Sequence, residues 1–214
     1  MHLYLESADP DEIREGLAWR VVDGVVTTPE LLARRSADAA EVLAELCRLH
    51  NGPVLAGVTS ADTADMVEEG RALAQLHERI VVRVPCTPAG IPAIAALADD
   101  RIPVDAMLCF SLPQALLAAK AGARFISPPV GEMDAAGGDG LSLMGAVITM
   151  LDQYDLKTSV LADGLVHPGH VAEASRMGAD AGAVSLSMLR GLADHPLTES
   201  LRRKQLERWR RAQN

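Results

Sequence analysis

Three charged residues have the types and positions that acid–base chemistry at a carbonyl group would need. Arg83 interrupts the apolar run IVVRVP, in which a β-strand is expected, and side-chain alternation points it toward the interior. Because an unpaired buried charge is costly, the guanidinium needs anionic partners, and Asp163 and Glu6 are the natural candidates. Arg83 could then bind a carbonyl or carboxylate while a carboxyl group of raised pKa moves a proton. The alternative is a buried ion pair that only fills the interior.

Other potential chemical groups give weaker signals. The chain has three cysteines, Cys47, Cys86 and Cys109. Neither zinc spacing nor a disulfide framework is present, so we interpret them as buried apolar side chains. His167 and His170 lie three residues apart without a third ligand nearby in sequence, which favours packing and capping over a metal pair. The glycine-rich segment 135–140 lacks the spacing of a phosphate-binding or dinucleotide-binding loop, and we interpret it as a plain loop.

The composition restricts the classes of function. The 214 residues carry a formal charge of −9, and 49% of them are hydrophobic although only 3% are aromatic. An aliphatic core is therefore expected, and the acidic balance argues against non-specific binding of nucleic acid or anionic membranes. No signal peptide or membrane-spanning run is recognised, so we expect a soluble, cytoplasmic protein. Only three residues are lysines, namely Lys120, Lys157 and Lys204.

The residues that could perform chemistry lie in a sequence in which apolar runs alternate regularly with helical patterns. Eight strand candidates are each followed by a helix, at 2–7, 24–28, 53–60, 80–87, 105–111, 124–131, 158–165 and 181–187. Near-continuous apolar strands are typical of a parallel sheet buried on both faces, and eight βα units favour a closed barrel. We therefore predict a single (β/α)8 TIM barrel over residues 1–214. Pro29 is expected to start one helix that runs to position 50.

The last helix of the chain has two interpretations. Residues 198–214 predict a basic amphipathic helical arm. In the first interpretation, Leu201, Leu206 and Trp209 pack this helix onto the barrel. In the second, the arm bridges protomers, because a tryptophan on a terminal helix can anchor an interface.

Active sites of such barrels lie at the carboxyl ends of the strands. Besides Arg83, Asp163 and Glu6, we expect five residues there to contact a substrate: Thr27, Thr28, Met107, Ser127 and Glu132. The expected ligand is a small molecule.

Several segments together resemble the transaldolase family, specifically the subgroup of small transaldolases and fructose-6-phosphate aldolases. The resembling segments are LYLESAD, DGVVTTPELL, IVVRVPCTPAG, QALLAAKAGARFISPPVGEMD, VLADGLVHPGHVAEASRMGAD and HPLTESLRRKQLERW. They cover almost the whole chain. The resemblance implies a TIM barrel, a homo-oligomer such as a pentamer or decamer, and no metal or organic cofactor.

The resemblance breaks down at the catalytic position. Members of this family form a Schiff base through a lysine on the fourth strand, and the residue at that position here is Arg83. An arginine stays protonated and is a poor amine nucleophile, so it cannot take over this role. Lys120, Lys157 and Lys204 are expected in an outer helix, before a strand and in the tail, where none can substitute.

The other functional positions of the family also differ. The first-strand aspartate is Glu6, the asparagine of T-T-N-P is Thr28, and the water-positioning residue of the third strand is Gly57. The fifth-strand threonine aligns with Met107 and the phosphate-binding serine and arginine with Gly164 and Val166, while another arginine becomes Glu132 and an aromatic residue becomes Pro129. An acidic cavity without these donors would repel a phosphate group, so we expect an unphosphorylated substrate.

Three hypotheses follow for the function. The first is an enzyme without a Schiff base that performs proton transfer, dehydration, cyclisation or aldol-type chemistry on a small carbonyl or sugar-derived compound. In it, Arg83 anchors a carbonyl or carboxylate group, and Asp163 or Glu6 is the acid or base. The second is a non-catalytic barrel that binds a ligand or a partner. The third is residual transaldolase or fructose-6-phosphate aldolase activity through one of the lysines.

Overall fold

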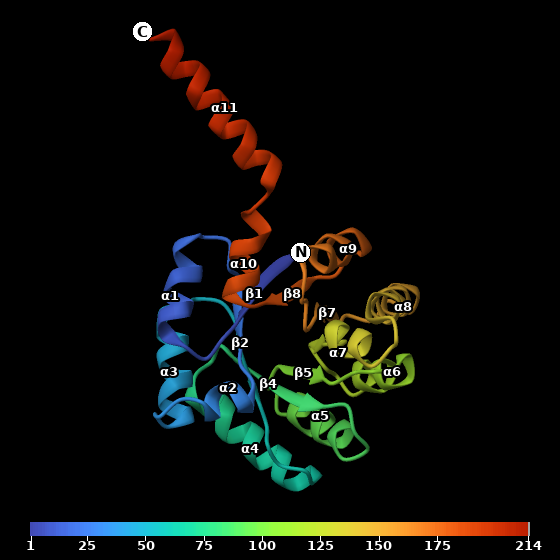
Figure 1. Cartoon of the computed structure of the whole chain (residues 1–214). Coiled ribbons are helices and arrows are strands. Elements are labelled where there is room, and N and C mark those ends of the chain that lie inside the picture. Colours follow the sequence, from blue (N-terminus) through green and yellow to red (C-terminus); the bar gives the residue numbers. More distant parts are fainter. Residues whose placement is uncertain (214) are drawn as a thin grey trace.

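Eight parallel strands close into a barrel in chain order, as the sequence predicts (Figure 1). The computed structural model describes residues 1–213. The strands are β1 (His2–Glu6), β2 (Gly24–Val26), β3 (Val54–Gly57), β4 (Ile80–Pro85), β5 (Val104–Met107), β6 (Phe125–Ile126), β7 (Ser159–Ala162) and β8 (Ala181–Val184). β1 pairs with both β2 and β8, which closes the ring.

Helices surround the barrel and connect its strands. They are α1 (Pro10–Ala18), α2 (Pro29–Ala33), α3 (Ala39–Leu49), α4 (Thr63–Leu76), α5 (Gly90–Asp99), α6 (Leu112–Lys120), α7 (Val130–Ala135), α8 (Gly140–Gln153), α9 (Pro168–Met177), α10 (Leu186–Ala193) and α11 (Pro196–Ala212). Several begin directly after a strand, because a side chain there caps the helix and a proline follows. Thr28, for example, accepts a hydrogen bond from the Leu31 amide and precedes Pro29. Short connections of this kind keep the carboxyl ends of the strands together.

Some predicted elements are shorter than expected. The helix predicted from Pro29 to position 50 is divided into α2 and α3, with a break over 34–38. Asp38, which precedes α3, has a non-helical ψ of 137°, and Arg35 donates a hydrogen bond to Asp9 at 2.6 Å. The strand predicted over 124–131 ends at Ile126, because the prolines at 128 and 129 have no amide to donate. Pro129 still forms an isolated bridge to Asp163.

Two apolar clusters support the barrel. The interior cluster, at the amino-terminal end, consists of Tyr4, Val26, Leu55, Val81, Phe125, Leu161, Ala181 and Ala183. The larger cluster is mostly aliphatic and lies between the strands and the helices, as the composition predicts. Gly24 is needed at the Tyr4 ring, since a Cβ there would lie 2.8 Å from the Tyr4 Cζ. The interior cluster forms the packed floor under the polar end of the barrel.

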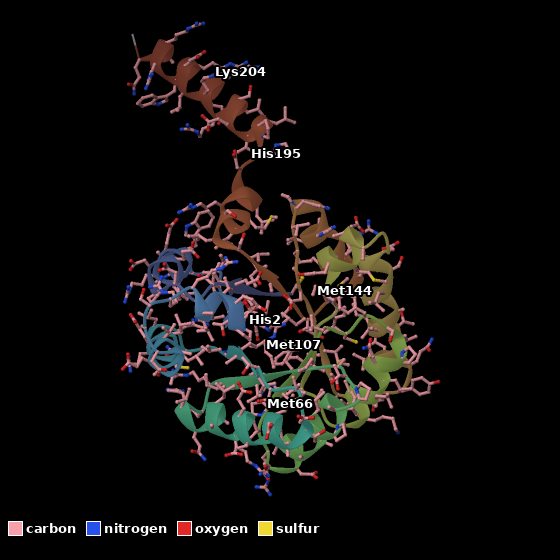
Figure 2. All side chains as sticks on the ribbon, turned by 60° about the horizontal axis from the view of Figure 1, so that its bottom comes forward. His2, Met66, Met107, Met144, His195 and Lys204 are labelled. Atoms are coloured by element: carbon pink, nitrogen blue, oxygen red, sulfur yellow. The ribbon has the colours of Figure 1, made fainter. Side chains whose placement is uncertain are left out.

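The terminal helix α11 extends away from the barrel (Figure 1). None of its residues is buried, and Leu201, Leu206 and Trp209 are 57%, 41% and 60% exposed. The interpretation that these three pack on the barrel of the same chain is therefore wrong. Figure 2 shows Lys204 on this arm, well separated from Met107 in the middle of the barrel. Within residues 1–213, no helix combines the length and the apolar character that crossing a membrane requires.

Candidate functional site

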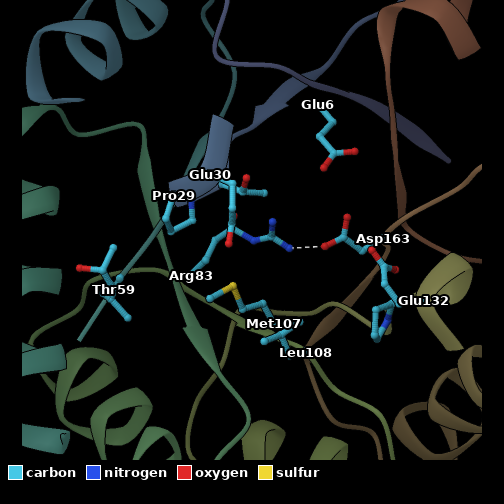
Figure 3. A pocket seen from close by; sticks show the side chains of 12 residues that line it. Glu6, Pro29, Glu30, Thr59, Arg83, Met107, Leu108, Glu132 and Asp163 are labelled. Atoms are coloured by element: carbon cyan, nitrogen blue, oxygen red, sulfur yellow. Dashed lines mark hydrogen bonds and ion pairs between the residues drawn. The ribbon is translucent and has the colours of Figure 1, made fainter. Parts of the chain in front are cut away.

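A cavity of about 620 Å³ opens at the carboxyl ends of the strands. Twelve residues line it: Glu6, Thr28, Pro29, Glu30, Val58, Thr59, Arg83, Met107, Leu108, Pro129, Glu132 and Asp163 (Figure 3). They come from the strands β1, β4 and β5, from the start of α2, from the loops before α2, before α4 and after β5, from the β6–α7 region and from the residue after β7. Six of the eight site residues predicted from the sequence are among them.

Arg83 forms the base of this cavity. It lies in the middle of β4 and is only 2% exposed. Its Nε donates to Asp105 Oδ2 at 2.7 Å, and its Nη2 donates to Asp163 Oδ2. Burial alone would lower the pKa of the guanidinium, but the carboxylates of Asp163 and Asp105 outweigh that effect and raise it. Arg83 is therefore a fixed cation.

One edge of the guanidinium remains available to a ligand. The Nη1 of Arg83 donates to no acceptor within residues 1–213. This nitrogen is also not fully buried. Its N–H groups consequently reach the cavity, which Arg83 lines. A donor fixed by two ion pairs at the base of a cavity suits an oxygen that carries or develops negative charge.

Asp105 is the partner that the sequence analysis missed. It is completely buried on β5, in register with Arg83, and also accepts a hydrogen bond from the Ser127 hydroxyl at 2.6 Å. Burial raises its pKa, whereas the charge of Arg83 and the bonds from Ser127 and Arg83 act against that rise. The strand begins at Val104, so Asp105 is an interior position of β5. A start one residue earlier than predicted, together with alternation, is the signal that would have found it.

Asp163 follows β7 and is held from both sides. Its Oδ2 accepts from Arg83, and its Oδ1 accepts from the Gly164 amide at 3.0 Å. The backbone of the adjacent segment continues the sheet, because the Val130 amide donates to the Asp163 carbonyl at 2.9 Å. The carboxylate is thus oriented toward Arg83, as the sequence predicts.

Glu6 shares the cavity but does not bond to Arg83, contrary to the expectation that it is a partner. No hydrogen bond or ion pair from another residue of 1–213 reaches its carboxyl group. Figure 3 shows this group pointing into the space that Arg83 and Asp163 also face. Burial raises the pKa of Glu6, and the negative charge of Asp163 adds to the rise, which Arg83 only partly offsets. Glu6 is therefore suited to taking up and releasing a proton.

Glu132 brings a further carboxylate to the mouth of the cavity from α7. Its Oε2 would lie 2.4 Å from a Cβ at position 164, a space that Gly164 leaves free. Gly164 also has a φ of +64°, a conformation that favours glycine. The close approach of these two residues fixes where the acidic side chain of Glu132 can lie.

The remaining predicted residues divide into two groups. Thr28 and Met107 line the cavity, where Met107 and Pro29 lie over Gly57. The Thr27 hydroxyl is buried and donates to the Leu55 carbonyl at 2.7 Å. Ser127 is also buried and bonds Asp105, as described above. Thr27 and Ser127 therefore lie outside the cavity lining and support the strands and the ion pair.

Several lining residues were not among the predicted site residues. Thr59 is fixed by Glu69, which accepts hydrogen bonds from the amide and hydroxyl groups of Thr59 and Ser60. Leu108 follows β5 with a φ of +55°, which is uncommon for a branched residue and turns the chain sharply at the mouth. Glu30 lies in the first turn of α2, two residues after the cap residue Thr28. In the sequence, only the position of these residues next to strand ends indicates that they could contribute to the site.

The weaker motifs do not join the cavity. All three cysteines are buried, and none lines it. His170 is buried and its Nε2 lies 3.1 Å from Asp134, with the His167 ring at 3.6 Å between centroids. Among residues 1–213, no group of three or more potential ligands is arranged to hold a metal ion. None of the three lysines lines the cavity either, since they lie at the end of α6, before β7 and on α11.

Comparisons with known proteins extend over nearly the whole chain. The family model described as Transaldolase/Fructose-6-phosphate aldolase matches residues 3–214. A protein of Kosmotoga olearia named "Probable transaldolase" is 40% identical, with 98% of this chain and 96% of the relative covered. Another of the same name, from Chlorobium phaeovibrioides, is 42% identical with 97% of each chain covered.

Similar solved structures support the architecture alone. A thiamine phosphate pyrophosphorylase from Pyrococcus furiosus superimposes with a TM-score of 0.59 at 18% identity, covering 86% of this chain and 85% of that one. A structure described as "Native KDPGal structure" gives a TM-score of 0.61 at 17% identity, covering 86% and 81%. At these identities the similarity concerns the barrel and not the chemistry.

Proposed function

The chain belongs to the transaldolase/fructose-6-phosphate aldolase family, and we propose that within it this barrel transfers protons on a small, unphosphorylated carbonyl compound without a Schiff base. Arg83 anchors the carbonyl oxygen, and Glu6 is the acid–base group. The observation that carries this proposal is the state of Arg83, a permanent cation whose Nη1 faces the cavity while Asp105 and Asp163 hold its other nitrogens.

In the alignment of IVVRVP with the family's motif that the sequence analysis proposes, Arg83 stands where members of the family have the Schiff-base lysine. An arginine there cannot form an imine, but it can stabilise the oxyanion that appears when a proton leaves the carbon beside a carbonyl. The three lysines do not line the cavity, so none is placed to form the imine instead.

The proposed step conserves atoms and charge. The carboxylate of Glu6 removes a proton from the carbon next to the carbonyl group, and the electrons of the C–H bond move to the carbonyl oxygen. Arg83 Nη1 donates to the resulting enolate oxygen, and Glu6 returns the proton to a carbon or oxygen of the intermediate. The raised pKa of Glu6 makes it a stronger base than an ordinary carboxylate. Asp163 orients Arg83 and is the other candidate acid or base.

Hydrogen exchange tests the proposal without knowledge of the natural substrate. We expect the protein to accelerate exchange of the α-protons of hydroxyacetone in D₂O, followed by ¹H NMR. Glu6→Gln should reduce the rate by roughly 10²–10⁴-fold. Glu68→Gln, an exposed α4 residue outside the cavity, is the matched control and should retain the rate. A wild-type rate equal to that of buffer would contradict the proposal.

A second experiment addresses residual transaldolase activity, which the names of the curated relatives favour. The protein is incubated with dihydroxyacetone or fructose 6-phosphate and reduced with borohydride, and its mass is measured. We expect an unchanged mass, because the lysines do not line the cavity. A stable adduct would show that a lysine forms an imine and would overturn the proposed chemistry.

A non-catalytic ligand-binding barrel is the second candidate. The observation that favours it is that two nitrogens of Arg83 already bond carboxylates, as in an ion pair that only fills the interior. In that case, calorimetry would detect binding of small carbonyl compounds while no exchange of their protons occurs. Exchange that depends on Glu6 would exclude this candidate.

The arm formed by α11 supports a homo-oligomer, which the resemblance implies to be a pentamer or decamer. The helix is basic, with six Arg or Lys and two Glu, whereas the whole chain carries a charge of −9. Its exposed Trp209 could anchor on an acidic neighbouring copy. We expect light scattering to give an oligomeric mass that Trp209→Glu reduces. A monomeric wild-type protein would contradict this expectation.

A further inference from the structure

The charge of the cavity is strongly unbalanced. Four carboxyl groups line it, those of Glu6, Glu30, Glu132 and Asp163, against the single guanidinium of Arg83. Asp105 adds a buried carboxyl group beneath, which accepts a hydrogen bond from Nε of that guanidinium. Asp163 accepts a hydrogen bond from its Nη2. The remaining three carboxyl groups have no cationic partner within residues 1–213.

An excess of carboxylates is not by itself a site, but this cavity also contains a buried donor. Arg83 is 2% exposed, and its Nη1 is available to a ligand at the base, as described above. The cavity therefore has two poles. The base offers N–H groups to an oxygen atom, and the walls and mouth offer carboxylates to a positive charge (Figure 3).

We infer that the substrate is an amino-carbonyl compound, such as an amino ketone or an amino sugar, whose ammonium group is held by Glu132 and Glu6 while Arg83 Nη1 binds its carbonyl oxygen. This inference rests on the proposed function, because it assigns the carbonyl to the same end of the cavity. A phosphorylated or carboxylated compound would face the same carboxylates with the wrong charge.

The positions of the carboxylates favour this arrangement over a purely neutral ligand. Glu132 approaches Gly164, the residue next to Asp163, so its charge lies close to the Arg83–Asp163 pair. Glu6 lies across the cavity and is partly buried. Burial and then the charges of Asp163 and Glu132 raise the pKa of Glu6, and an ammonium group between Glu132 and Glu6 would offset the part that comes from repulsion. Glu6 would thus become more fully ionised when such a ligand binds, which is the state that its role as a base requires.

A matched pair of probes isolates the ammonium group. Aminoacetone and hydroxyacetone have the same number of heavy atoms and differ in one group, NH₃⁺ or OH. Binding of each is measured by calorimetry or ligand-observed NMR at about pH 6.5 under argon, where the amine is protonated. We expect aminoacetone to bind about ten-fold more tightly at low salt and this preference to decline at about 0.5 M salt.

Substitutions locate the ammonium group. Glu132→Gln should reduce the preference for aminoacetone over hydroxyacetone by about three- to ten-fold, because only aminoacetone loses an ion pair. Glu68→Gln removes one negative charge outside the cavity, so it should change neither affinity. Equal affinities of the wild-type protein for the two probes would overturn the inference, as would a preference that Glu132→Gln does not alter.

Failure of this inference and failure of the proposed function give different results. If aminoacetone is preferred and this preference depends on Glu132, the inference stands even when neither probe exchanges its protons, and the proton-transfer step alone is then wrong. If hydroxyacetone exchanges its protons through Glu6 but aminoacetone binds no better, the inference is overturned and the proton transfer stands.

Discussion

The two carboxylates that hold Arg83 should contribute very differently to stability. Asp105 is fully buried and accepts hydrogen bonds at 2.7 Å from Arg83 Nε and at 2.6 Å from Ser127 Oγ. The side chain of Asp163 is 18% exposed at the base of a cavity. Removing one partner of a fully buried ion pair leaves an uncompensated charge, whereas water can approach a partner that borders a cavity.

From these environments we expect Asp105→Asn to lower the free energy of unfolding by about 3–5 kcal/mol. Asp163→Asn should lower it by about 1–2 kcal/mol, because water in the cavity can replace part of the lost interaction. In a chain of this length, each kcal/mol corresponds to a change in Tm of about 2–4 °C. The asparagine variants preserve side-chain volume, so the difference between them reports charge and not packing.

The assay is urea unfolding followed by circular dichroism, with thermal unfolding as a second measurement. Asp152→Asn is the control, because this aspartate is exposed on α8 and its change should remain within about 0.5 kcal/mol. Hydrogen exchange of hydroxyacetone, measured on the same preparations, should decrease with Asp163→Asn although that variant stays folded. Equal losses of stability for the two variants would refute the reasoning from burial, as would a larger loss for Asp163→Asn.

Three further predictions concern the same cavity. Arg83→Lys should not produce a borohydride-stable adduct near pH 7, because Asp105 and Asp163 would keep the new ammonium group protonated; mass spectrometry after reduction checks this, and an adduct would contradict it. Glu6→Gln should stabilise the fold at pH 7 by about 0.5–2 kcal/mol and have less effect near pH 4. The reason is that a carboxyl group whose pKa is raised on folding lowers the free energy of unfolding as the pH rises from its unfolded to its folded pKa. Urea unfolding at both pH values checks the sign. Gly164→Ala should cost about 1 kcal/mol or more and displace Glu132, which weakens aminoacetone binding in calorimetry, and unchanged stability and binding would be the contrary result.

Much of the fold could be predicted because burial on both faces leaves a strong signal in the sequence. Each of the eight strands is an apolar run, and the structure has them in the predicted order. The lengths were harder to predict, since a run such as RFISPPVG remains apolar after its prolines have ended the regular pairing. The pattern at the end of the chain predicted a helix, which the structure contains as α11, but such a pattern does not say which surface the helix contacts.

The sequence predicted which strands carry site residues, but it did not always predict which side chains of a strand face the cavity. Arg83 and Asp163 were identified because a charge within an apolar run demands a partner. Asp105 was missed because its strand was started one residue too late, which left it at an end instead of in the interior. Thr27 and Thr28 are adjacent and of the same type, yet Thr28 lines the cavity and Thr27 bonds a neighbouring strand. One residue of phase moves a side chain to the opposite face, and composition cannot reveal it.

The excess of negative charge connects the stability of the barrel with its chemistry. Carboxylates that face one another in a partly buried cavity destabilise the fold unless something positive offsets them. Arg83 is already engaged by Asp105 and Asp163, so its charge offsets that of Glu6 only in part. Burial and the negative charge of Asp163 raise the pKa of Glu6, so ionisation of Glu6 costs more free energy here than it would in water. A cationic ligand beside Glu6 would offset part of that cost. The same charge imbalance that opposes ionisation of Glu6 therefore favours a positively charged substrate, whose binding would favour the ionised base beside it.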